Sequence, residues 1–129
     1  MKRVMGMALA TTLALLLPAL PAAAQGVSIT LVPRSAAETE ALRLALMLYA
    51  LREGGSGVVQ GGQGNAAALL QSGGGQVGLI RQRGRGHRAT LTQTAPGTAW
   101  AIIQGGRGAQ AAVTQDRPGD VGLTLQYGW

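Results

Sequence analysis

The chain has 129 residues and a formal net charge of +6, with no cysteine and only 3% aromatic residues. The lack of cysteine excludes a disulfide framework and a cysteine-based metal site. So few large side chains argue against a conventional compact core, and the Gly-, Gln- and Ala-rich composition resembles a low-complexity segment.

The first 24 residues have the pattern of a secretory signal peptide. Lys2 and Arg3 precede an apolar run from Val4 to Leu17, and Ala22–Ala24 provide a small-residue cleavage site. The alternative is a membrane anchor, but a run of about 14 residues is shorter than the roughly 20 needed to cross a bilayer. We therefore expect residues 1–24 to be removed on export. Loss of their two basic residues leaves nine Arg against five acids, a net charge of +4.

Residues 25–54 are predicted to form a short strand followed by a helix. Val27 to Val32 is a β-prone run that a proline ends. Ser35 and Glu38 then have the spacing of a capping box, and two glycines end the Leu- and Ala-rich run that follows. The sequence thus predicts a helix over 36–53. Apolar residues cover most of its circumference, so we expect it to pack as a cap on the first repeat. A role in secretion or membrane contact is the alternative.

From residue 55 onward, one pattern recurs every 22 residues: Gln, Gly two and four residues later, Ala seven later and Gln eleven later. Such a period is typical of a solenoid or repeat array. The pattern defines three full repeats and a partial fourth, at 55–76, 77–98, 99–120 and 121–129. The glycines expected in turns are Gly62, Gly64, Gly84, Gly86, Gly106 and Gly108.

Each repeat holds two short β-prone runs separated by Gly-rich turns. The first runs are 57–60, 77–82, 99–104 and 121–126, and the second runs are 65–71, 87–93 and 109–115. Side chains alternate between faces, which puts the glutamines inside with small aliphatic residues. We predict an all-β fold, a short β-solenoid of stacked strand–turn–strand units. Copies about 4.8 Å apart would align equivalent polar side chains in hydrogen-bonded ladders. The predicted ladder residues are Gln60, Asn65, Gln71, Gln82, His87, Gln93, Gln104, Gln115 and Gln126.

Signals for catalysis, cofactors and metals are weak. His87 is the only histidine, and the sequence has no cluster of His, Cys and carboxylates. Gly73-x-Gly75-x-x-Gly78 matches a dinucleotide-binding fingerprint by letters alone, because it opens no helix. We expect no catalytic residue, no cofactor and no metal.

Four arginines (Arg81, Arg83, Arg85 and Arg88) form a basic cluster at outward or turn positions. A basic patch can bind nucleic acid or anionic surfaces, but no aromatic residue interleaves this one to stack on bases. We interpret it as a solvated face whose charge slows premature stacking. Contact with extracellular DNA or an acidic polysaccharide is the alternative.

The spacing Gln-x-Gly-x-Gly-Asn-x-Ala-x3-Gln resembles the curlin repeat of curli fibre subunits, and Gln60 to Gln71 fits every marked position. His87 and Ala109 replace Asn in the next two copies, and the Tyr127-Gly128-Trp129 ending is also similar to short curlins. The resemblance implies a secreted subunit of a cell-surface amyloid fibre that supports adhesion and biofilm formation. Its partners would be further copies of itself, other curlin subunits and a curli secretion apparatus. It would be neither an enzyme nor an integral membrane protein.

Two other functions stay open at this point: a minor nucleator that templates the major subunit, and a monomeric exported β-solenoid that binds glycan. The sequence shows no obvious C-terminal cap. We therefore expect the fourth copy to leave an open strand edge that accepts the first copy of another molecule.

Overall fold

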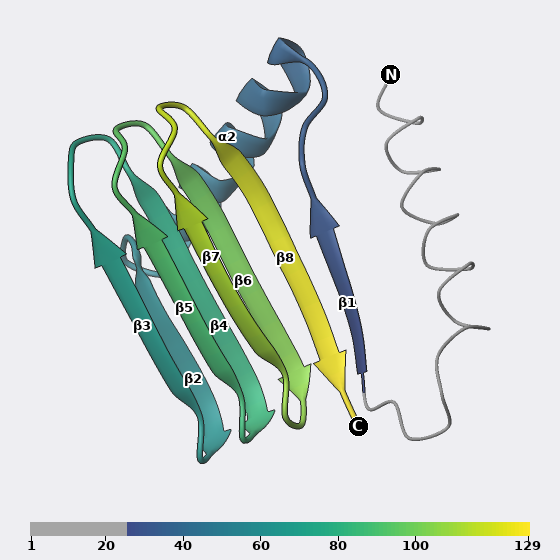
Figure 1. Cartoon of the computed structure of the whole chain (residues 1–129). Coiled ribbons are helices and arrows are strands. Elements are labelled where there is room, and N and C mark those ends of the chain that lie inside the picture. The colour runs from purple at the N-terminus through teal and green to yellow at the C-terminus, as the bar shows by residue number, and fades with distance from the viewer. Residues whose placement is uncertain (1–25) are drawn as a thin grey trace.

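A computed structural model describes residues 26–129 and shows two stacked β-sheets with a helix on one outer face (Figure 1). In chain order the elements are β1 (Gly26–Leu31), α2 (Ala36–Arg52), β2 (Gly57–Gln63), β3 (Ala66–Gln71), β4 (Val77–Arg85), β5 (Arg88–Gln93), β6 (Ala99–Gly106), β7 (Gln110–Gln115) and β8 (Val121–Gly128). This arrangement confirms the predicted β-solenoid with an N-terminal helix. The predicted signal peptide lies outside the described residues.

The 22-residue period sets the strand order. Within residues 26–129, sheet A has the order β1-β8-β6-β4-β2 and sheet B the order β3-β5-β7. Neighbouring repeats pair in parallel with equivalent residues opposite each other, so that Gln60 lies opposite Gln82 and Gln71 opposite Gln93. Each full repeat therefore contributes one strand to each sheet, and β8 adds a fourth parallel strand to sheet A.

β1 breaks this parallel order. It runs antiparallel to β8, from Gly26 opposite Gly128 to Leu31 opposite Leu123, and Figure 1 shows the two strands side by side. The expectation that the fourth copy leaves an open edge is therefore wrong. An unpaired β8 would present a row of free N–H and C=O groups, and the β-prone N-terminal run satisfies them.

The opposite end of the solenoid is different. β2 and β3 have no strand partner on their outer sides among residues 26–129. The apolar residues Val58, Val59 and Leu70 on these strands are 39%, 38% and 59% exposed, whereas Ile80, the equivalent of Val58 one repeat later, is 1% exposed. We call the outer sides of β2 and β3 the open edge.

The strands of sheet A are longer than predicted. β2, β4 and β6 continue through residues assigned to turns, so that Gly62, Gly84 and Gly106 belong to strands. The chain reverses at Gly64, Gly86 and Gly108, which lie between the strands of each repeat. The reason is that parallel pairing continues across the first glycine of each copy, with Gly62 opposite Gly84 and Gly106 opposite Gly128.

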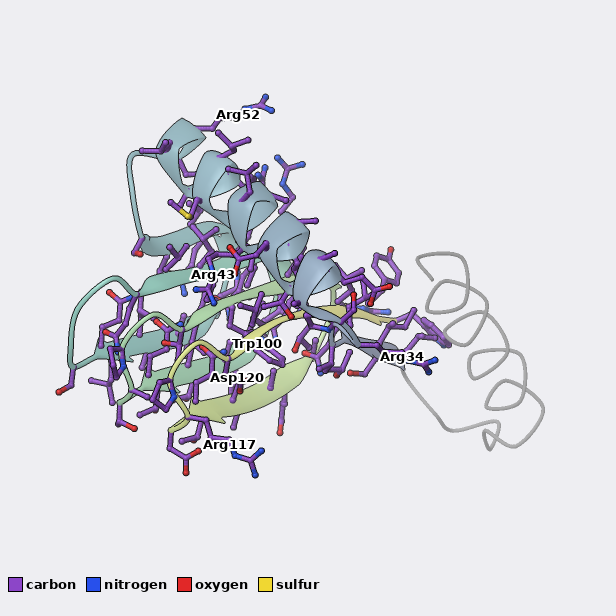
Figure 2. The ribbon with its side chains drawn as sticks, turned by 90° about the horizontal axis from the view of Figure 1, so that it is seen from above. Arg34, Arg43, Arg52, Trp100, Arg117 and Asp120 are labelled. Carbon is purple, nitrogen blue, oxygen red and sulfur yellow. The ribbon has the colours of Figure 1, made fainter. Side chains whose placement is uncertain are left out.

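The interior between the sheets is thin. Ile80, Leu91 and Ile102 form its apolar part, together with the indole of Trp100. Trp100 fits because the equivalent residues on the strands beside it are glycines, and a Cβ at Gly122 would lie 2.0 Å from the indole ring. Figure 2 shows the position of Trp100 relative to the strands. A large side chain is thus accommodated by small residues one repeat away.

α2 does not cap the first repeat, contrary to expectation. It lies over the outer face of sheet A, where Leu46 and Ala50 pack with Leu79, Ala101 and Val121 (Figure 2). The reason is that the residues equivalent to Leu79 differ between the repeats. The first repeat has Gly57 opposite Leu79, and a glycine offers a helix nothing to bury. Among residues 26–129, no helix is long and apolar enough to cross a membrane.

α2 is also held by polar contacts. Ser35 caps it by accepting a hydrogen bond from the Glu38 N–H at 3.1 Å. Arg43 donates to the carbonyl of Gly97 and, at 2.9 Å, to that of Gly119. In Figure 2 Arg43 lies on the side of the helix that faces the strands, and Arg52 projects away from them. These contacts tie the helix to the turns that precede β6 and β8.

Candidate assembly edge and glutamine ladders

Two columns of glutamine run through the interior. In the sheet A ladder, each amide nitrogen donates to the amide oxygen of the next copy at 2.7, 2.8 and 2.7 Å, in the order Gln60, Gln82, Gln104 and Gln126. In the sheet B ladder, the corresponding distances are 2.8 and 2.7 Å, in the order Gln71, Gln93 and Gln115. These are short for amide hydrogen bonds and follow from the strict repeat register.

The buried amides are satisfied on both sides. The second N–H of Gln82 donates to the Ala66 carbonyl and that of Gln93 to the Val77 carbonyl, each at 2.9 Å and each across to the opposite sheet. These cross-sheet bonds also define which amide atom is nitrogen. Gln82 and Gln93 are both fully buried. Burial of an amide is costly without hydrogen-bond partners, so the ladders are what make a polar interior tolerable.

The ladders have a direction, because each copy donates to the copy that follows it. At the open edge, the amide oxygens of Gln60 and Gln71 accept no hydrogen bond from the described part of the chain. At the other end, Gln126 donates to the Ser28 hydroxyl and Gln115 to the Asp120 carbonyl. One end of the solenoid therefore offers acceptors, and the donors of the other end are occupied.

Asn65 and His87 form a third polar contact between repeats. The Asn65 side-chain oxygen accepts from the His87 backbone N–H at 3.0 Å, and His87 Nδ1 accepts from the Ala109 N–H at 3.1 Å. His87 Nε2 lies 2.7 Å from the Arg83 carbonyl and therefore carries the proton. The Asn65 amide likewise donates to a carbonyl four residues earlier, that of Gly61, so the imidazole accepts and donates as Asn65 does in the preceding copy. Ala109 has no side-chain oxygen, so this series ends there.

This equivalence predicts how position 87 responds to substitution. We expect His87→Asn to stay within about 1 kcal/mol of the wild type in free energy of unfolding, because an amide can make both hydrogen bonds. His87→Leu should cost about 1–3 kcal/mol, because the buried Ala109 N–H and the part-buried Arg83 carbonyl lose their side-chain partner. Denaturant midpoints of freshly prepared monomer measure the difference. Equal losses in the two variants would contradict the hydrogen-bonding role.

The four predicted arginines do not lie on one surface. Arg81, Arg83 and Arg85 belong to β4 in sheet A, whereas Arg88 belongs to β5 in sheet B. Arg81 donates to the Tyr49 hydroxyl at 2.9 Å and lies 3.6 Å from the Glu53 carboxylate. The hydrogen bond to Tyr49, aided by Glu53, raises the pKa of Arg81. Arg81 therefore helps to hold α2, and binding of a polyanion by the cluster stays a prediction.

Sequence reasoning missed three residues that complete the site. Ser28 and Asp120 accept from the last glutamines of the two ladders, and Trp100 fills the interior. Only the position of Trp100 could have been predicted from the sequence, because glycines, which leave room for a large side chain, stand 22 residues before and after it at Gly78 and Gly122. Within residues 26–129, no group of three or more His, Asp and Glu side chains could hold a metal ion.

The geometry defines a class: a β-solenoid repeat protein with laddered glutamines inside and an unpaired edge at one end. Residues 62–94 match the family model of the curlin associated repeat. The match confirms the resemblance seen in the sequence: this segment is a curlin repeat, and the solenoid arrangement is consistent with the curlin family. Neither the search of curated proteins nor that of solved structures gave a match.

Proposed function

We propose that this chain is a structural subunit of an extracellular, curli-like amyloid fibre. The observation that carries the proposal is the open edge. There, the backbone groups of β2 and β3 are unpaired on their outer sides among the described residues, and both ladders end in amide oxygens without a donor. A strand edge of this kind is a template for another chain.

The interior favours addition of the same kind of chain. Parallel, in-register strands with stacked glutamines are the arrangement found in amyloid. An incoming strand that follows the register would supply an amide donor to Gln60 and would cover the apolar side chains of Val58 and Val59. The curlin repeat supports a proposed role in adhesion and the biofilm matrix, and the predicted signal peptide supports secretion.

The proposal is tested with purified residues 25–129. We expect a lag followed by growth of thioflavin fluorescence, and fibres that diffract at about 4.8 Å along the axis and about 10 Å across it. Preformed fibres should remove the lag. A chain that stays monomeric for days in the presence of such seeds would refute the fibre function.

A nucleator would use the same open edge, but it would template another subunit rather than continue with itself. The two roles differ in where the chain sits in a mature fibre. We expect antibody labelling along the whole length for a major subunit and at initiation points for a nucleator. The ladders, in register through every repeat, favour the major subunit.

Glycan binding has less support. A flat binding face would need outward residues of one kind in register, and the row across sheet A is mixed: Arg81, Ile103 and Leu125. A shallow hollow of about 300 Å³ does lie on this face, but arginine, aliphatic and tyrosine side chains line it together.

A further inference from the structure

We propose that β8 is a second assembly surface, which β1 occupies within the free subunit until the β2 strand of another copy displaces it. This inference rests on the proposed fibre function. It assigns β1 the role of an internal placeholder, so that each junction between two subunits requires the release of one β1.

β1 occupies the position that the next repeat would take. It pairs with six residues of β8, from Leu123 to Gly128. Ser28 lies opposite Gln126, and its hydroxyl accepts the amide hydrogen that would otherwise continue the sheet A ladder. The Gln126–Ser28 distance is 3.2 Å, whereas glutamine pairs within the ladder lie at 2.7–2.8 Å. β1 therefore completes the ladder with a longer bond.

The open edge of a second copy matches the surface beneath β1. In the 22-residue register, an incoming β2 would place Gln60 opposite Gln126 and Gly62 opposite Gly128. The free amide oxygen of Gln60 would then accept from Gln126, as Gln82 accepts from Gln60 inside the molecule. Acceptors at one end and donors at the other make the pairing head-to-tail, and such pairing forms an open filament.

β1 is also held lightly. None of its residues is buried. Within residues 26–129, sheet A has four parallel strands and sheet B has three. No strand of sheet B therefore lies across from β1 to cover its inner face. The exchange replaces the backbone hydrogen bonds between β1 and β8 with those between the incoming β2 and β8, as in strand addition. α2 need not move, because Arg43 and the packing of Leu46 hold it independently of β1.

The sheet B ladder is closed at this end in a different way. Gln115 donates to the carbonyls of Ala99 and Asp120, at 3.2 and 3.0 Å. Both of its amide hydrogens are therefore used inside the subunit, and removal of β1 does not free them. The junction that we propose is made by sheet A alone.

A disulfide between β1 and β8 tests the proposal, because the chain has no cysteine of its own. Ile29 and Leu125 lie opposite each other on the outer face, away from the ladder. Facing residues of antiparallel strands lie within the Cα separation that a disulfide spans. The variant is Ile29→Cys with Leu125→Cys. The matched control is Thr90→Cys with Ala112→Cys, which links β5 to β7 and leaves β1 free.

We expect the oxidised β1–β8 variant to lose seeded elongation and to recover it when dithiothreitol is added. Small amounts of oxidised variant mixed with wild type should terminate growing ends, because a locked subunit offers its open edge but no β8 surface. The oxidised control should elongate like the wild type. Elongation of the locked variant at the rate of its reduced form would overturn the inference and leave the fibre function standing. Failure of the wild type to form fibres would instead refute the fibre function.

A second variant covers the case in which the cysteines themselves disturb assembly. Val27→Gly with Ile29→Gly removes two β-branched side chains from β1 and raises the entropy of the released strand. We expect a shorter lag and faster elongation than in the wild type. Unchanged or slower kinetics would count against β1 as a placeholder.

Discussion

Gly84→Ala is expected to destabilise the fold by at least about 3 kcal/mol, well beyond the roughly 1 kcal/mol of an average substitution. A Cβ at this position would lie 1.8 Å from the backbone oxygen of Gly106, on the neighbouring strand. The backbone there also has a φ of +111°, which side chains other than glycine rarely adopt. Relief would require two paired strands to separate, because the obstacle is backbone rather than a flexible side chain.

Gly86→Ala is the matched control, two residues further along the same strand–turn segment. Its φ is +73°, but a Cβ there has its nearest neighbour, the Gly108 nitrogen, at 3.9 Å. We expect a loss of about 1–2 kcal/mol from backbone strain alone. Urea unfolding of freshly prepared monomer measures both variants. Equal losses would show that the close approach of Gly84 and Gly106 does not govern stability.

Gln93→Ala is expected to lower the free energy of unfolding by at least about 2 kcal/mol and to slow assembly. Gln93 is fully buried, donates to Gln115 and to the Val77 carbonyl, and accepts from Gln71. Its loss interrupts the sheet B ladder at its middle member. The acceptors on Gln115 and Val77 then lose a donor in an interior that offers few replacements.

Two controls separate the hydrogen bonds from the volume of the side chain. Gln93→Met keeps most of the volume and removes the amide, so it should recover little of the lost stability if the ladder is what matters. Gln110→Ala removes an exposed glutamine from β7 and should change stability by less than about 0.5 kcal/mol. An unchanged assembly rate in Gln93→Ala would refute the ladder role.

The solenoid could be predicted because the same short spacing of Gln and Gly recurs every 22 residues. A constant spacing from Gln60 to Gln126 admits one parallel register in which like residues meet, and alternation then places the glutamines inside. The ends of the strands were less predictable. Glycines such as Gly84 were assigned to turns, but Gly84 stays in the strand because pairing with the preceding repeat continues through it, opposite Gly62.

The basic cluster shows a different limit. Arg85 and Arg88 are three residues apart in the sequence, yet the turn between them sends them to different sheets. Arg81 contacts Tyr49 and Glu53, which are about thirty residues away in the chain and in no repeat relation to it. Residues that are close in the sequence are therefore not always close on the surface. The turn after β4 leads the chain from sheet A to sheet B, so that arginines on either side of it lie on different sheets.

By itself, the sequence determined the repeat, its period, the interior glutamines and the resemblance to curlin repeats. Only the tertiary structure decided where the non-repeating segments go. β1 has no equivalent within the repeats, so no register specified its partner, and it pairs with β8 because that edge has free backbone groups. α2 likewise lies where sheet A presents Leu79 and Ala101, rather than on the glycine-bearing first repeat. The residue spacing of a repeat fixes the register in which it pairs with the next repeat. The position of a segment outside the repeats depends instead on where the folded repeats leave backbone groups unpaired or apolar side chains uncovered.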